Sequence, residues 1–261
     1  MTPFSSVMTL DAVADGFAAH VPGDWLQGRT TYGGLSAALC VEAAGRAFGG
    51  LPPLRSAQFA FAGPASGGLR IETRVLRQGK SSVFAGVDLF GEEGLATRAL
   101  LCFAAERESA LAYENLAPPA VPGPEVCSPI LAGGPVPAFM RHFDFRQAGG
   151  HAPVSGSAEP HYMFWIRHRD DPVAATPAAC LALADAAPPT AMAMFNAFAP
   201  VSTMTWTVDF AGELFAGGLE WCLLESRAER VRGGYSRQST RIWRADGTPL
   251  LLASQCVAVF V

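Results

Sequence analysis

The 261-residue sequence is short of the features that mark several large classes of protein. Lys80 is the one lysine among 19 basic residues, the net charge is −4, and there is no basic tract, which argues against a nucleic-acid partner. No run of about 18 uninterrupted apolar residues occurs, so no membrane span is expected. The first ten residues do not combine a basic stretch with an apolar run, so no signal peptide is expected either. These absences predict a soluble, cytoplasmic protein.

The six cysteines are scattered, with no CxxC pair and no cluster of cysteine and histidine. Such pairs and clusters are typical of disulfide frameworks and zinc sites. The sequence therefore predicts free, buried thiols in a reducing compartment and no metal site. Histidines between residues 142 and 168, with Asp170 and Asp171, match no metal-ligand spacing, and solvated loop positions explain them better.

Familiar motifs for catalysis and nucleotide binding are missing as well. The sequence contains no GxSxG, which argues against a serine-nucleophile hydrolase. It contains neither a P-loop nor GxGxxG, so nucleotide hydrolysis and dinucleotide binding have no support. No cofactor is expected.

What the chain does contain is material for a large core, because half of its residues are hydrophobic and 16% are charged. Two segments rich in alanine and leucine predict buried helices, at residues 33–46 and 177–187. Alternating apolar and polar residues predict strands. The predicted strands are residues 55–62, 69–77, 82–90, 95–105, 161–168, 202–210, 219–227, 235–243 and 250–260.

The two halves of the chain resemble each other. Residues 61–63, followed by two glycines and Leu69, correspond to residues 210–212, followed by two glycines and Leu219. Each half reads as a strand, a buried helix and four strands, which predicts an internal duplication that packs as a pseudo-twofold pair. A segment with many prolines and no sustained period, including Pro135, separates the halves as a surface linker. The predicted division is 1–107, 108–137 and 138–261.

The second predicted helix carries an unusual carboxylate. Residues 177–187 are small and apolar on every side, as in a helix inside a protein, yet Asp185 stands in the penultimate turn. An ionised carboxylate without a partner is costly to bury, so Asp185 must be paired, protonated or directed into a wet pocket. Both a structural acid at the helix end and a catalytic acid fit this pattern.

Several short motifs occur in a defined order along the chain. They are Tyr32-Gly33-Gly34, Ser81-Ser82-Val83-Phe84, Trp165-Ile166-Arg167, Leu183-Ala184-Asp185, Thr203, and Asp246-Gly247 eight residues before Gln255. Their order and spacing resemble those of the acyl-CoA thioesterase II-like family. The resemblance implies an α+β double hotdog, in which two antiparallel sheets, each wrapped around a central helix, are fused in one chain.

The resemblance also implies an activity and a site. It implies hydrolysis of acyl-CoA to free acid and CoA without a cofactor, by a water that Asp185, Thr203 and Gln255 hold. Fused hotdogs often pair further, so a homodimer or higher homo-oligomer is compatible with it. The sequence departs from the family at residues 205–207, which read Thr-Trp-Thr. This departure keeps open an alternative, a non-catalytic acyl or acyl-CoA binding protein.

The three residues suit thioester hydrolysis chemically. Asp185 can take a proton from water, or it can attack the thioester and form an anhydride. Thr203 and Gln255 can orient a water without adding charge, although Thr203 alone is equally an ordinary strand threonine. Gln255 shares a strand face with Ala253 and Val257, so its amide needs a buried partner.

Tyr32, Gly33 and Gly34, at the start of the first helix, are predicted to bind the substrate. The bare N–H groups of the glycines suit a thioester oxygen, although a simple tight turn also explains the pair. In single-domain hotdog thioesterases, which this part of the chain resembles, an acid follows a Gly-Gly pair after seven residues. Here the position seven residues after Gly34 holds Val41, and the one seven before Asp185 holds Ala178. One half thus keeps the glycines and the other keeps the acid, which predicts one competent site instead of two.

Two further sets of residues are open to more than one interpretation. Glu42, one place from the position of Val41, is a reserve candidate for the acid, although a paired structural role fits it better. Met192, Met194, Phe195 and Phe198 follow the second helix, and they either line an acyl tunnel or belong to the core.

Overall fold

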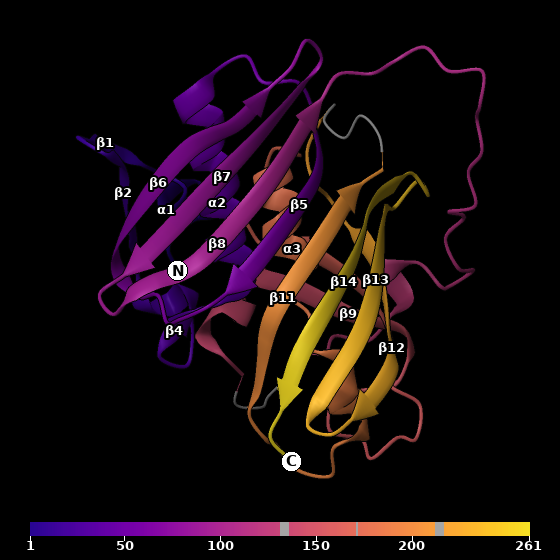
Figure 1. The fold of residues 1–261 in the computed structure, drawn as a ribbon. Coiled ribbons are helices and arrows are strands. Elements are labelled where there is room, and N and C mark those ends of the chain that lie inside the picture. Colours follow the sequence, from indigo (N-terminus) through magenta and orange to yellow (C-terminus); the bar gives the residue numbers. More distant parts are fainter. Residues whose placement is uncertain (131–135, 171, 212–216) are drawn as a thin grey trace.

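The computed structural model describes residues 1–130, 136–170, 172–211 and 217–261. In this part of the chain one antiparallel sheet of twelve strands dominates, and helices lie on one side of it (Figure 1). In spatial order its strands are β1 (Asp11–Val13), β2 (Gly16–Val21), β6 (Gly67–Gln78), β7 (Ser82–Gly91), β8 (Gly94–Ala104), β5 (Leu54–Phe61), β11 (Val201–Phe210), β14 (Pro249–Val259), β13 (Tyr235–Arg244), β12 (Cys222–Arg232), β10 (His161–His168) and β9 (Phe143–Gly150).

The order of the strands repeats outward from the centre of the sheet. From β5 the first half runs β8, β7, β6, β2 and β1, and from β11 the second half runs β14, β13, β12, β10 and β9. This repeat agrees with the internal duplication predicted from the sequence. The predicted pair of separate sheets is not what the structure has, because β5 and β11 pair from Ala60–Thr205 to Ser56–Asp209 and join the halves into one sheet (Figure 1).

Two helices fill the concave side of this sheet. The longer, α2 (Gly33–Phe48), is buried over most of its length, and α3 (Pro177–Ala184) is buried throughout. The α3 helix begins at Thr176, whose hydroxyl accepts the N–H of Ala179 at 3.1 Å, with a proline at the first helical position. It ends earlier than the sequence predicts, so that Asp185 is the C-cap, with φ −95° and ψ 1°.

The proline-rich segment lies across the outer face of the second half. Trp165 and Trp243 point outward from β10 and β13, and their indole N–H groups donate to the carbonyls of Pro122 (2.8 Å) and Leu116 (2.5 Å). Because the segment covers these large rings, it packs against the sheet in addition to connecting the halves. Pro135 of this segment, with Asp171 and Gly212, lies outside the described residues.

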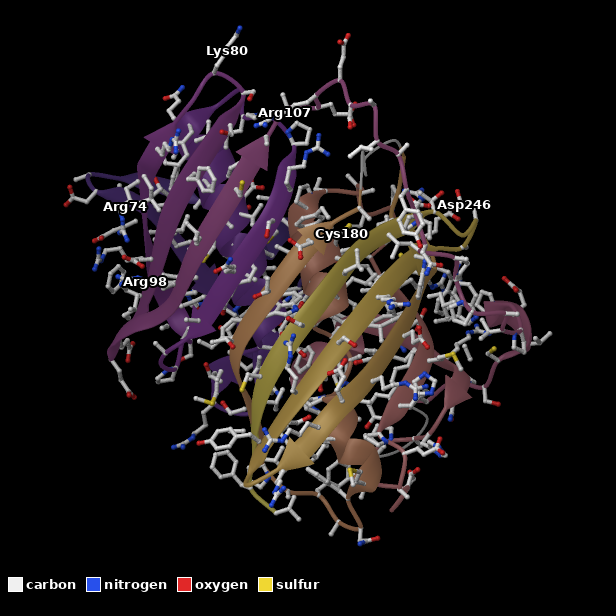
Figure 2. All side chains as sticks on the ribbon, turned by 45° about the vertical axis from the view of Figure 1, so that its right-hand side comes forward. Arg74, Lys80, Arg98, Arg107, Cys180 and Asp246 are labelled. Carbon is white, nitrogen blue, oxygen red and sulfur yellow. The ribbon has the colours of Figure 1, made fainter. Side chains whose placement is uncertain are left out.

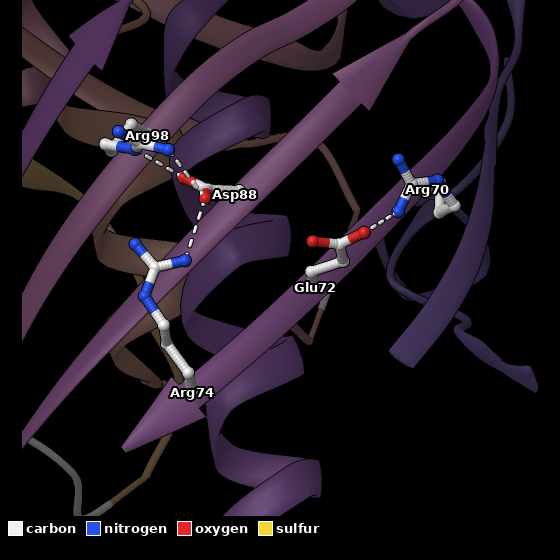
Figure 3. A network of polar contacts seen from close by, with 5 residues as sticks. All are labelled: Arg70, Glu72, Arg74, Asp88 and Arg98. Carbon is white, nitrogen blue, oxygen red and sulfur yellow. Dashed lines mark hydrogen bonds and ion pairs between the residues drawn. The ribbon is translucent and has the colours of Figure 1, made fainter. Parts of the chain in front are cut away.

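The outer face of the first half is polar and carries one buried carboxylate, Asp88 of β7. It accepts hydrogen bonds from Arg98 at 2.6 and 2.8 Å and from Arg74 at 2.9 Å (Figure 3). Figure 2 shows both arginines on the β6–β7–β8 part of the sheet, away from Asp246. The guanidinium of Arg98, with that of Arg74, lowers the pKa of Asp88 below its ordinary value, although burial opposes this.

The structure also bears on the predicted absences. In the described ranges no helix has both the length and the apolar character that a bilayer span requires. All six cysteines are free. In the same ranges no three histidine, cysteine or acidic side chains gather as metal ligands. The prediction of solvated loop positions is wrong for His142 and His168, which are 3% and 4% exposed and face the carbonyls of Asp24 and Ala179. The division at residues 107 and 137 stays a prediction.

Candidate active site

Asp185 lies on the wall of a large cavity between the two halves. The cavity has a volume of about 950 Å³, within the range of small-molecule sites. Its walls come from α2, β5, β9, β10, β11 and β14, from the segment after α3, and from residues 27–31, 62–65 and 136–140. Of the described residues that line it, Asp185 is the one with an ionisable side chain. A single carboxyl group therefore faces a mostly apolar space.

The environment of Asp185 makes it a base suited to neutral pH. Burial raises the pKa of its carboxyl group from 3.8 to about 7, while a hydrogen bond from Gln255 and the backbone N–H of Gly34 act in the opposite direction. As the C-cap of α3, Asp185 stands at the negative end of its own helix, and the N-terminus of α2 supplies the opposite partial charge. A carboxyl group with this pKa is about half ionised near pH 7.

The two glycines allow the carboxylate to approach the first turn of α2. A Cβ atom on Gly33 would lie 2.8 Å from Oδ2 of Asp185, and one on Gly34 would lie 2.9 Å from Cβ of Asp185. Both distances are too short for any larger residue without movement of the helices. The glycine pair from the first half and the acid from the second thus form one site. The resemblance to hotdog thioesterases, applied to the spacing in each half, predicted this asymmetry.

Gln255 contacts Asp185 directly. From β14 its Nε2 donates to Oδ1 of Asp185 at 2.6 Å, and its side chain is 7% exposed. Its face of the strand is otherwise apolar, so the carboxylate is the polar partner that the sequence required. A short N–H···O bond to an ionised acceptor is among the stronger hydrogen bonds in proteins.

Thr203 reaches the cavity because β11 is irregular. The register between β11 and β14 shifts between Thr203 and Thr205, so Thr203 pairs with Val257 and shares the inner face with Trp206, which pairs with Gln255. Met204 is 44% exposed. Strict alternation along 202–210 would place Met204 inward and Thr203 outward. The β-bulge instead turns Met204 outward and brings Thr203 to the cavity wall.

Gln255 is held in turn by a glutamine that sequence reasoning missed. Gln238 of β13 donates from Nε2 to Oε1 of Gln255 at 2.6 Å, and its own Oε1 accepts the backbone N–H of Thr190 at 2.9 Å. A sequence signal for this contact exists, because counting outward from the Asp246-Gly247 turn pairs residue 238 with residue 255, as observed.

Other predicted residues lie outside the cavity wall. Tyr32 is buried, its hydroxyl donates to the carbonyl of Ala182 at 3.2 Å, and its ring stacks on Phe139, so its contacts are those of a packing residue. Glu42, the reserve acid, pairs with Arg46 at 2.8 Å on the surface. The divergent residues 205–207 are absent from the described lining, which ends on β11 at Thr203.

The apolar residues after α3 divide between the two interpretations. Met192 and Phe198 line the cavity, and Phe198 is 73% exposed. Phe195 is buried in a small cluster with Met192, whereas Met194 is 40% exposed. Phe198 therefore stands where the cavity meets the solvent.

Comparison with known families identifies the chain. The family model for the acyl-CoA thioesterase C-terminal domain matches residues 114–259, and that for the N-terminal domain matches residues 21–104. The chain belongs to the acyl-CoA thioesterase family. No curated protein sequence matches this thioesterase-family chain.

Solved structures similar to this thioesterase-family chain extend over its whole length. A protein of Alicyclobacillus acidocaldarius, described as having a hot dog fold and unknown function, is 24% identical with a TM-score of 0.91, covering 99% of this chain and 98% of its own. A Thermobifida fusca protein provisionally assigned as a thioesterase II is 23% identical (TM-score 0.83; coverage 100% and 98%). Acyl-CoA thioesterase II TesB2 of Mycobacterium marinum is 18% identical (TM-score 0.77; coverage 98% and 97%). The fold is therefore the hotdog fold.

Proposed function

We propose that this chain hydrolyses acyl-CoA thioesters to the free acid and CoA, with Asp185 as general base. One observation carries the proposal: the carboxyl group that faces the cavity has a pKa of about 7 and accepts a hydrogen bond from Gln255. A base is most effective when its pKa lies near the working pH, because it is then both ionised and able to take a proton. The family membership supports the same reaction class.

In the proposed reaction Asp185 removes a proton from a water molecule as the water oxygen attacks the thioester carbon. Because Oδ1 already accepts from Gln255, Oδ2 beside Gly33 is the oxygen that receives the proton. The tetrahedral intermediate then expels the thiolate as the C–S bond breaks, and the proton on Asp185 passes to the sulfur. The products are the carboxylic acid and the thiol of CoA.

Three groups around the base have supporting roles in this proposal. The hydroxyl of Thr203 and the amide of Gln255, both on the cavity wall, orient the attacking water. The N–H of Gly33 at the positive end of α2 stabilises the charge on the carbonyl oxygen. The N–H of Gly34 interacts with Asp185 instead, and the ring of Tyr32 packs against Gly34. We also propose that residues 1–107 and residues 138–261 each form one hotdog half of the chain.

The test measures release of free thiol from a panel of acyl-CoAs, from short to long and including aryl groups, by the parent and by Asp185→Asn. Asparagine keeps the volume and an acceptor for Gln255 but cannot take the proton. We expect turnover of at least one substrate and a loss of about 10²–10⁴-fold in kcat for Asp185→Asn. Full activity of this variant would refute the assignment of the base. Binding of acyl-CoA without any turnover would favour the alternative, a non-catalytic acyl-CoA binding protein.

A further inference from the structure

A buried chain of hydrogen bonds extends from Asp185 away from the cavity, and the proposed reaction does not use its distant members. After Gln255 it passes to Gln238, which is 3% exposed, and then to the backbone of Thr190, which is fully buried. The hydroxyl of Thr190 continues it to Ser226 at 2.6 Å, and Thr240 also donates to Ser226, at 2.9 Å. Four elements, the turn at 190–194 and strands β12, β13 and β14, thus meet behind the candidate base.

The direction of this chain is fixed at one end. A backbone N–H can only donate, so the atom of Gln238 that faces Thr190 must be its oxygen, Oε1. The NH₂ group of Gln238 consequently faces Gln255, where it requires the oxygen of that amide. The NH₂ group of Gln255 is then left to face Asp185. The orientation of both amides follows from one backbone group.

We propose that Gln238 is a positioning residue that keeps the N–H end of the Gln255 amide on Asp185. The proposal deepens the function proposed above and rests on it for the catalytic consequence. Gln238 touches neither the cavity nor the carboxyl group, and it acts only through Gln255.

The alternative amide orientation shows why such a restraint matters. If Gln255 were reversed, its oxygen would face a carboxylate oxygen at 2.6 Å, which is repulsive as long as the carboxylate is ionised. Asp185 would then retain its proton to higher pH. The neighbouring titratable group is Tyr32, whose pKa is raised by burial first and by the charge of Asp185 second, so it stays neutral and supplies no replacement charge.

The variant that tests the proposal is Gln238→Met, which keeps the approximate volume and removes both polar ends. We expect kcat to fall about tenfold with little change in KM, because the water is misoriented while the acyl cavity is untouched. We also expect the pKa of Asp185 to rise by about one unit, because a reoriented Gln255 no longer donates fully to the ionised carboxylate. The pKa is read from the pH profile of kcat/KM and from ¹³C NMR of labelled aspartate carboxyl groups, with Asp185→Asn assigning the signal.

The matched control is Ser226→Ala. It deletes a buried hydroxyl of the same hydrogen-bond chain, on a residue that is 4% exposed and does not contact Gln255. We expect this variant to lose stability while its kcat and the pKa of Asp185 stay within about twofold and 0.2 units of the parent. An equal change in both variants would overturn the proposal, since it would then reflect loosening of the core in general.

A second variant, Gln238→Glu, covers the case in which Gln238→Met does not fold. It keeps the acceptor for the N–H of Thr190 and, when ionised, offers Gln255 no donor, so the pKa of Asp185 should again rise. An unchanged pKa of Asp185 in the Gln238 variants would overturn the proposal. Because NMR needs no turnover, a shifted pKa together with an inactive parent would uphold the positioning role and refute the proposed reaction instead.

Discussion

Replacing the candidate base should stabilise the protein while it abolishes activity. The folded protein holds the proton of Asp185 more tightly than the unfolded chain does, because the pKa of the carboxyl group is about 7 when folded and 3.8 when unfolded. The folded state is therefore favoured at low pH, and this advantage is lost as the pH rises from about 4 through 7. Asp185→Asn has no carboxyl group to titrate at this position, so this variant does not lose stability in the same way as the pH rises.

The size of the effect follows from the two pKa values. A shift of three units corresponds to about 4 kcal/mol in total, of which about 2.6 kcal/mol falls between pH 5 and pH 8. Contact of the carboxyl group with the cavity reduces the cost of its charge. We therefore expect the free energy of unfolding of the parent to fall by about 2 kcal/mol more than that of Asp185→Asn over this interval.

The assay is urea denaturation of both proteins at pH 5 and pH 8. For each protein the free energy of unfolding at pH 8 is subtracted from that at pH 5, and the two results are then compared. This comparison cancels the contributions of the other titrating groups, which are common to the two proteins, and any effect of the substitution that is independent of pH. Parallel pH dependences of the two proteins would refute the reasoning, because they would mean that Asp185 has an ordinary pKa. The proposed role as a base near neutral pH would then lose its physical ground.

Four further predictions concern single residues. Thr203→Val should lower kcat about tenfold in the thiol-release assay at unchanged stability, since one hydrogen bond to water is worth about 1.4 kcal/mol. Gly34→Ala places a Cβ 2.6 Å from the Tyr32 ring and should lower the free energy of unfolding, measured by urea denaturation, by about 2–3 kcal/mol. Gly45→Ala on the same helix meets nothing within 4 Å and should gain up to about 1 kcal/mol. Asp88→Asn should lower the free energy of unfolding by about 1–3 kcal/mol at pH 7. The difference in stability between the parent and this variant should become smaller below pH 4, as Asp88 of the parent is protonated.

The sequence predicted most of the central strands but not how the halves meet. Alternation and glycine turns located the strands from residue 54 to 104, because each has one buried face. Strands β1, β2 and β9 were missed, and β9 ends in Gln147-Ala148-Gly149-Gly150, which alternates weakly. Alternation reports which face of a strand is buried and not whether its edge has a partner, so the single sheet through β5 and β11 could not be inferred.

The sequence predicted the residues of the candidate site but missed the features that position them. Asp185 was accessible to sequence reasoning because a carboxylate within an apolar helix needs an explanation. The bulge at Met204 has no signal in the alternation, which would have excluded Thr203 from the inner face. Gln238 was within reach, since counting outward from Asp246-Gly247 pairs it with Gln255, and the observed pairing is the same despite a register shift between Ile242 and Trp243.

Because β5 pairs with β11, the proposed activity would report on both halves of the chain at once. The glycines come from one half and the acid from the other, and backbone hydrogen bonds from residues 56–60 to 205–209 hold the halves in register. A slip of two residues along this seam would move one helix against the other by about 7 Å, far more than the site tolerates. A partly unfolded species that retains only one half would therefore be catalytically silent, and separately produced halves should recover activity only when they reassemble along this seam.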